Sequence, residues 1–165
     1  MVSWKQQTNN LQESWAKFFQ LSWQERWILL QAFEFLPLIA AGLHCMNFQR
    51  LSSILVRFSP MSGEVCSDAA MQQAAATTTA HLVQVAVSRT PFKVTCLVRS
   101  TALWFLLRRQ GIGSEIRIGV SQQEGTFKAH AWVESNGIVL NDRNDIHNQY
   151  VAFEQIILPD GTERI

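Results

Sequence analysis

The stretch from Cys96 to Gly111, CLVRSTALWFLLRRQG, carries the clearest helix signal in the 165-residue sequence. Its apolar residues recur at helical spacing, and it closes on Arg108 and Arg109 just before Gly111. Basic side chains in a last turn and a glycine directly after it are typical of a helix C-terminus. We therefore predict a helix that begins at Cys96 and stops at Gly111.

Cys96 falls at the N-terminus of this predicted helix. Unpaired backbone N–H groups and the helix dipole favour an anion there, so a thiolate is stabilised. The same N–H groups lie close to where an acyl oxyanion would form. A lone cysteine is nevertheless more often a buried core residue, so Cys96 needs partners before it indicates catalysis.

The hydrophobic period changes to two after Gly113, which indicates strands. We expect a polar loop over 121–126 and a type I′ turn at Asn136-Gly137. The predicted strands cover 115–120, 127–135, 138–141 and part of 152–158, with a terminal turn at 159–161. An Ala-rich stretch over 67–88 predicts a further helix before them. Helices followed by antiparallel strands indicate an α+β fold, in which the helix that carries Cys96 packs on an antiparallel sheet.

His130 lies in the second predicted strand, where alternation puts it on the polar face. A two-residue hairpin turn returns the chain beside this strand, so Asp142 is expected within a residue of His130. A carboxylate there would hold the imidazole and favour the useful tautomer. Asp145 and Glu134 are alternative orienting acids, although both are worse placed along the chain.

Residues 1–62 are expected to form a helical N-terminal segment that packs on the core or on a partner. Residues 63–165 would form the core itself, the two parts making one structural unit. Ser22 and Glu25 resemble a capping box, and a second helix start lies near Asn47.

The segment from Trp27 to Phe48 is apolar and about as long as a membrane span. Gln31 and Glu34 interrupt it, and a carboxylate within hydrocarbon costs about 2.5 kcal/mol or more. Pro37 is expected to break or kink a continuous helix. We therefore favour a helical hairpin or a buried helix pair, with membrane contact as the alternative.

Charge and cysteine content exclude several classes of function. The 14 Lys and Arg are balanced by 13 Asp and Glu and are dispersed, which disfavours a nucleic-acid partner. Cys45, Cys66 and Cys96 follow no Cys-x-x-Cys pattern, and the histidines other than His130 lack metal-ligand spacing, so we expect neither a metal nor a cofactor. The first residues do not resemble a secretory signal, and a cytoplasmic location is expected.

Five stretches carry a resemblance to a known family: CLVRS (96–100), LLRRQGI (106–112), RIGV (117–120), AHAWVE (129–134) and VLND (139–142). They resemble the leader peptidases of lasso-peptide biosynthesis, in their stand-alone B-type form. The order Cys, His, Asp is that of papain-like and transglutaminase-like cysteine hydrolases. The resemblance implies a transglutaminase-like cysteine protease fold and places the catalytic triad on Cys96, His130 and Asp142.

The implied function is removal of the leader from a ribosomally made lasso precursor peptide. His130 would take the Cys96 proton, the thiolate would attack the scissile carbonyl, and water would release the leader from the thioester. Arg99 is a candidate second oxyanion donor, with a structural ion pair as the alternative. The implied partners are the precursor leader peptide, a separate PqqD-like leader-recognition protein and the asparagine-synthetase-like macrocyclase.

Two other functions fit the same residues. A triad of this kind can pass the acyl group to an amine, as transglutaminases do. A non-catalytic scaffold could instead tether precursor and cyclase through the apolar helices, although an intact Cys96, His130 and Asp142 argues against it.

Overall fold

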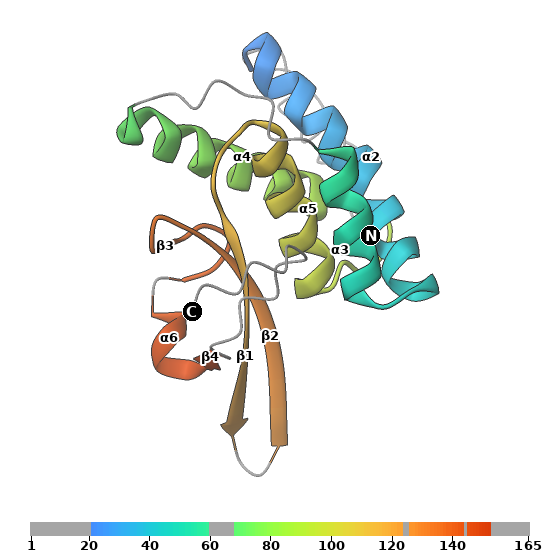
Figure 1. The fold of residues 1–165 in the computed structure, drawn as a ribbon, viewed down its shortest axis with the longest axis vertical. Helices are drawn as coiled ribbons and strands as arrows, with labels where there is room; N and C mark the ends of the chain where they lie inside the picture. The colour runs from blue at the N-terminus through green and yellow to red at the C-terminus, as the bar shows by residue number, and fades with distance from the viewer. Residues whose placement is uncertain (1–20, 60–67, 124–125, 144, 153–165) are drawn as a thin grey trace, which may run out of the picture.

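The computed structural model describes residues 21–59, 68–123, 126–143 and 145–152. The helices of residues 23–109 gather at one end of the molecule, and an antiparallel sheet of strand order β3-β2-β1-β4 extends from them (Figure 1). The elements are α2 (Trp23–Cys45), α3 (Phe48–Phe58), α4 (Ala69–Arg89), α5 (Cys96–Arg109), β1 (Glu115–Gln123), β2 (Thr126–Ser135), β3 (Ile138–Val139), α6 (Ile146–Gln149) and β4 (Val151–Ala152). The predicted α+β class is confirmed.

Helix α5 lies at the centre of the core. Every residue from Val98 to Leu107 except Arg99 is buried, and the helix packs on α2, α4 and β2. It ends as predicted: Gly111 adopts a positive φ of 72°, and the Ile112 N–H donates to the Leu107 carbonyl. The nearly complete burial of α5 explains why its sequence is apolar on most of its faces.

Helix α2 buries a narrow stripe against α4 and α5. Its buried residues follow helical spacing: Leu29, Ala32, Leu36 and Ile39. The predicted capping box is confirmed, since the Ser22 side chain accepts from the Glu25 N–H and the Glu25 carboxylate accepts from the Ser22 N–H. The predicted start of α3 at Asn47 is confirmed as well, because its side chain accepts from the Arg50 N–H.

A break at Pro37 was wrong, because α2 continues as one helix from Trp23 to Cys45 with Pro37 inside it. Pro37 and Phe33 are both exposed, and the Phe33 carbonyl that loses its N–H partner therefore lies on the side that water reaches. By length and composition alone α2 could cross a membrane, and 22% of its apolar window is buried inside the protein. The cytoplasmic location stays a prediction. Large exposed apolar side chains on α2 include Trp23, Trp27, Leu30 and Leu38.

Strands β1 and β2 pair in one continuous register, from Glu115 opposite Glu134 to Gln123 opposite Thr126. The polar loop predicted over 121–126 was wrong at both ends, because backbone pairing extends β1 through Gln123 and starts β2 at Thr126. Residues 124 and 125 lie outside the described residues. The predicted type I′ turn is confirmed by positive φ values at Asn136 and Gly137.

The outer strands are shorter than predicted. β3 pairs as expected at Glu134–Val139 and Ser135–Ile138 but ends there rather than at residue 141. The reason is that the Asn141 side chain takes the Val133 N–H that a longer strand would have used. β4 pairs with β1 at Gly119 and Val120. The rest of the strand predicted over 152–158, the terminal turn and the segment boundary at residues 62 and 63 lie outside the described residues.

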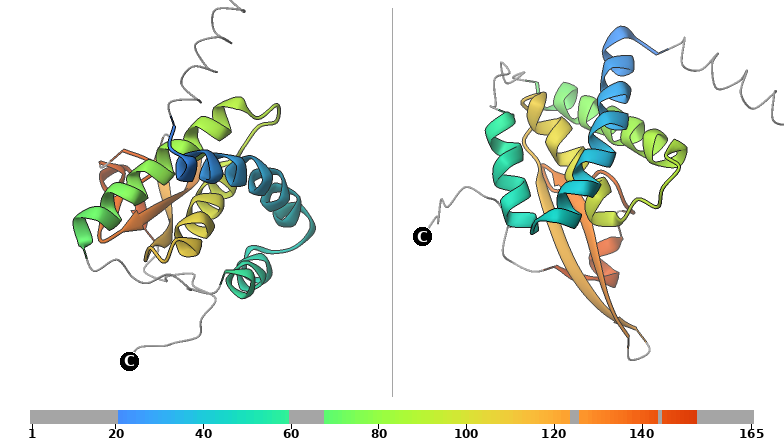
Figure 2. Two further views of the ribbon diagram at one scale, coloured as in Figure 1. Left: turned by 90° about the horizontal axis from the view of Figure 1, so that it is seen from above. Right: turned by 90° about the vertical axis from the view of Figure 1, so that its right-hand side faces the viewer.

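The β1–β2 hairpin projects past the N-terminus of α5, as Figure 1 and the right-hand view of Figure 2 both show. β3 covers the outer side of β2 only at Glu134 and Ser135, and β4 covers β1 only at Gly119 and Val120. Beyond β3, the Val133 carbonyl still accepts from the Leu140 N–H. Nearer its tip, the described part of the hairpin pairs only with itself.

Candidate active site

Helix α5 begins at Cys96, as predicted. The Thr95 hydroxyl accepts from the Val98 N–H at 3.3 Å, and the Thr95 carbonyl accepts from the Arg99 N–H at 3.0 Å. The N–H groups of Cys96 and Leu97 therefore have no acceptor within the helix. The Cys96 thiol is half-buried and forms no disulfide. Two N–H donors at the positive end of a core helix thus lie beside a reduced thiol.

His130 and Asp142 are in direct contact. The His130 Nε2 atom lies 2.6 Å from the Asp142 Oδ2 atom, and each side chain is 22% exposed. Because the carboxylate occupies Nε2, Nδ1 is the ring nitrogen left to exchange a proton. The pair therefore has the geometry of a base held by an acid while remaining accessible to solvent.

The ionisation of Asp142 is set by opposing effects. Partial burial raises its pKa, but hydrogen bonds to His130 and to the Arg143 N–H, together with the charges of His130 and Arg99, outweigh this and hold the pKa of Asp142 below its usual value. Asp142 is consequently a carboxylate throughout the neutral range, the form that orients an imidazole.

Arg99 links the acid to the helices. Its Nη2 atom lies 3.4 Å from the Asp142 Oδ2 atom, and its Nη1 atom donates to the Gln84 Oε1 atom of α4 at 3.2 Å. Of the two roles considered for Arg99, these contacts favour a structural ion pair over an oxyanion donor.

Cys96 and the His130–Asp142 pair are connected through one side of α5. Arg99 and Ser100 lie three and four residues after Cys96, on the same side of the helix. Arg99 contacts Asp142, and the Ser100 hydroxyl donates to the Ala131 carbonyl, the residue after His130, at 2.9 Å. Among the described residues no hydrogen bond joins the Cys96 thiol to the His130 ring. The joint catalytic role of the three residues stays a prediction.

The alternative acids have other partners. Glu134 accepts from the Trp132 indole N–H and pairs with Arg117 at 3.5 Å. Asp145 pairs with Arg143 at 3.2 Å. Asp142 is therefore the acid, of the three considered, that the fold brings to the imidazole.

Aromatic rings support His130 in a way that the sequence analysis missed. The imidazole stacks on Trp132, with centroids 6.4 Å apart, and lies tilted against Tyr150 at 5.3 Å. Gly119, opposite His130 on β1, leaves room for them: a Cβ there would lie 2.9 Å from the indole and 3.1 Å from the Tyr150 Cβ. The alternation that puts Trp132 on the same face as His130 was the available signal.

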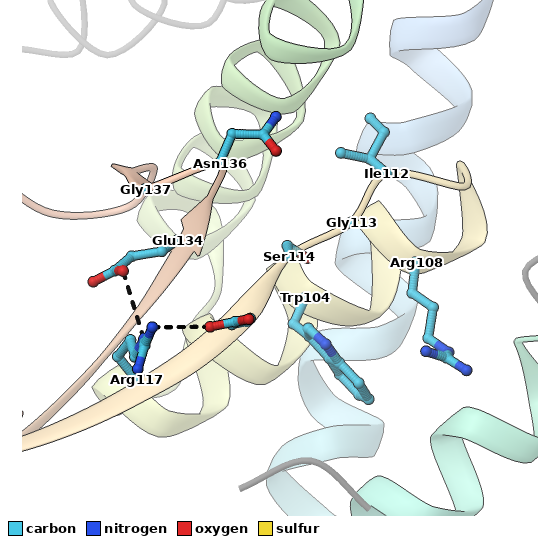
Figure 3. A pocket seen from close by; sticks show the side chains of 10 residues that line it. Trp104, Arg108, Ile112, Gly113, Ser114, Arg117, Glu134, Asn136 and Gly137 are labelled. Atoms are coloured by element: carbon cyan, nitrogen blue, oxygen red, sulfur yellow. Dashed lines mark ion pairs between the residues drawn. The ribbon is translucent and has the colours of Figure 1, made fainter. Parts of the chain in front are cut away.

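A separate pocket of about 490 Å³ opens at the C-terminal end of β2, beside the Asn136-Gly137 turn (Figure 3). Arg117 lies within it and pairs with Glu115 at 3.0 Å and with Glu134 at 3.5 Å. The residues that line this pocket include none of the three candidate catalytic residues. Within the described ranges, no group of three or more His, Cys, Asp or Glu side chains is arranged to hold a metal ion.

Cys96 begins a core helix that packs on the antiparallel sheet, and the His130–Asp142 pair lies at this sheet. Such a core is compatible with cysteine peptidases and acyltransferases. The family model described as the transglutaminase-like superfamily matches residues 43–156, and the chain belongs to that superfamily. No curated protein and no solved structure matches the chain. The predicted family is thereby confirmed at the superfamily level.

Proposed function

We propose that this protein is a cytoplasmic cysteine peptidase that removes the leader from a ribosomally synthesised lasso precursor peptide. The observation that carries the enzymatic part is the 2.6 Å contact between His130 and Asp142, held by Arg99 to the helix that Cys96 opens. The lasso substrate rests on the five sequence stretches that resemble leader peptidases, and superfamily membership supports the chemistry.

The proposed mechanism is that of a cysteine peptidase. His130 accepts the thiol proton at Nδ1 while Asp142 stabilises the imidazolium through Nε2. The Cys96 thiolate attacks the scissile carbonyl, and the Cys96 N–H stabilises the oxyanion. His130 then returns the proton to the leaving amine of the core peptide, which leaves the leader as a thioester on Cys96. Water hydrolyses this thioester and restores the thiol.

An open edge of β2 supports a peptide as the substrate. The Ala131 and Val133 carbonyls accept bonds from Ser100 and Leu140, on the side away from β1. Alternation places the N–H and C=O of Ala129 on the same side, where no described segment pairs with them. An extended peptide could add a strand at this edge, directly beside His130.

The decisive experiment is a cleavage assay read by mass spectrometry, in which the precursor is incubated with the protein and its leader-recognition partner. We expect a free leader, and a loss of turnover of about 10³-fold or more in Cys96→Ala, because no other group supplies the nucleophile. Cys45→Ala is the matched control, since that cysteine is exposed on α2, and it should keep full turnover. A Cys96→Ala protein that still removes the leader would support the scaffold function instead.

Acyl transfer is the second candidate, because superfamily membership is equally compatible with it. The same assay with an added primary amine separates the two reactions. Hydrolysis yields a leader with a free carboxylate, whereas transfer yields a leader joined to the amine. Dominance of the amide product would replace peptidase by acyltransferase and leave the role of Cys96 unchanged.

A further inference from the structure

A buried polar link joins α5 to the sheet. Ser100 is 0% exposed; its hydroxyl donates to the Ala131 carbonyl at 2.9 Å and accepts from the Asn141 Nδ2 atom at 2.9 Å. The Asn141 Oδ1 atom accepts from the Val133 N–H at 2.8 Å. The Ser100 hydroxyl has one proton and gives it to Ala131, so it must accept from the amide, and the orientation of the Asn141 side chain is thereby determined.

Each member of this link is close in sequence to a different candidate catalytic residue. Ser100 lies one helical turn after Cys96, Asn141 directly precedes Asp142, and the Ala131 carbonyl belongs to the residue after His130. The three hydrogen bonds therefore hold together the backbone of the three segments that carry the thiol, the base and the acid.

We propose that Ser100 and Asn141 are positioning residues that keep Cys96, His130 and Asp142 in the arrangement needed for catalysis. This rests on the proposed cysteine chemistry. Neither side chain touches the substrate in this role; each acts through the backbone to which it is bonded. Displacement of a reacting group by about 1 Å can cost about 10²-fold in rate, so a link of this kind controls turnover beyond its effect on stability.

The short β3 strand supports this role. Continued antiparallel pairing would join the Val133 N–H to the Leu140 carbonyl, but the Asn141 side chain accepts from that N–H instead. The chain is thereby released from the sheet at Asn141, and Asp142 reaches Nε2 of His130 rather than continuing along the edge of β2.

The test measures the reactivity of the Cys96 thiol directly and needs no substrate. In a Cys45→Ser, Cys66→Ser background, the rate of Cys96 alkylation by iodoacetamide is followed against pH for the parent protein, Ser100→Ala, Asn141→Asp and His130→Ala. Ser52→Ala is the matched control, because Ser52 is also a buried helical serine but bonds within its own helix, to Gln49. Urea unfolding identifies the variants that are folded at the assay temperature.

We expect Ser100→Ala and Asn141→Asp to move the alkylation profile towards that of His130→Ala. In the cleavage assay they should lower kcat by about 10- to 100-fold, with KM changed less than about twofold. Ser52→Ala should leave both readouts unchanged. Asn141→Asp keeps the acceptor for the Val133 N–H, so it tests the link even if Ser100→Ala does not fold.

The outcome that overturns the proposal is a folded Ser100→Ala or Asn141→Asp protein whose alkylation profile matches the parent while His130→Ala shifts it. Failure of the proposed function looks different. In that case the parent protein cleaves no precursor, whereas the alkylation profile still responds to His130, Ser100 and Asn141.

Discussion

The two halves of β2 differ sharply, although they belong to one strand with one register. Residues 131–135 are all buried, and β3, Asn141 and Ser100 hold their outer edge. Residues 127–129 are all exposed and pair only with β1 among the described segments. His130 lies at the boundary and is half-buried. A base needs a fixed position and access to substrate, and this boundary provides both.

Removing the buried half's largest side chain should produce the largest effect. Trp132 is 0% exposed and packs with Val139, Ile146 and Tyr150. Trp132→Ala should lower the free energy of unfolding by about 3–5 kcal/mol, since the site cannot collapse around so large a cavity. Urea denaturation measures this. A loss below about 1 kcal/mol would show that the buried half is not a rigid support.

Crowding the boundary should have a smaller effect. A Cβ at Gly119 would lie 2.9 Å from the ring of Trp132, which is fully buried and cannot move aside. Gly119→Ala should therefore destabilise the fold by about 1–3 kcal/mol. Gly113→Ala is the matched control, because nothing lies within 4 Å of its added Cβ, and it should have almost the stability of the parent. Equal free energies of unfolding for Gly119→Ala and Gly113→Ala would contradict the close packing around His130.

Acidification should reveal the ion pairs at the boundary. The pKa of Asp142 in the folded protein lies below its usual value of 3.8. Ionised Asp142 therefore contributes its full stabilisation above about pH 3.8, and this contribution is lost as the pH falls through the lower pKa of the folded state. Urea unfolding of the parent and of Asp142→Asn, compared on both sides of pH 3.8, isolates this contribution. The difference in free energy of unfolding between the parent and Asp142→Asn should narrow towards acid pH. A difference that stays constant with pH would contradict the lowered pKa of Asp142.

Changing the exposed half should have the smallest effect on stability. Phe127 is 73% exposed, so Phe127→Ala should alter the free energy of unfolding by less than about 0.5 kcal/mol. If the exposed half of β2 binds peptide, Phe127→Ala should raise KM with kcat nearly unchanged. Val151→Ala, on the opposite edge of the sheet and 76% exposed, is the matched control. Equal KM values in Phe127→Ala and Val151→Ala would show that the exposed half of β2 is not part of the peptide site.

Local signals predicted helix starts and the tight turn better than the ends of strands. The Ser22 and Glu25 capping box, the start at Asn47 and the Asn136-Gly137 turn were all confirmed, because each depends on residues within a few positions of one another. The extension of β1 through residues 121–123 was missed, because a partner strand, not side-chain polarity, decides where a strand ends. The predicted break at Pro37 was wrong for a related reason. The free-energy cost of a proline within a helix depends on whether water reaches the carbonyl that loses its N–H partner.

The candidate site divides in the same way. Sequence placed Cys96 at the start of its helix, because a stop glycine, a basic last turn and helical spacing are readable within sixteen residues. The two-residue hairpin turn also predicted that Asp142, rather than Glu134 or Asp145, lies beside His130, and the structure shows that contact. Only the tertiary structure decided that Ser100 and Asn141 join the three segments. Those contacts join residues far apart along the chain, and their energies depend on burial that no local pattern encodes.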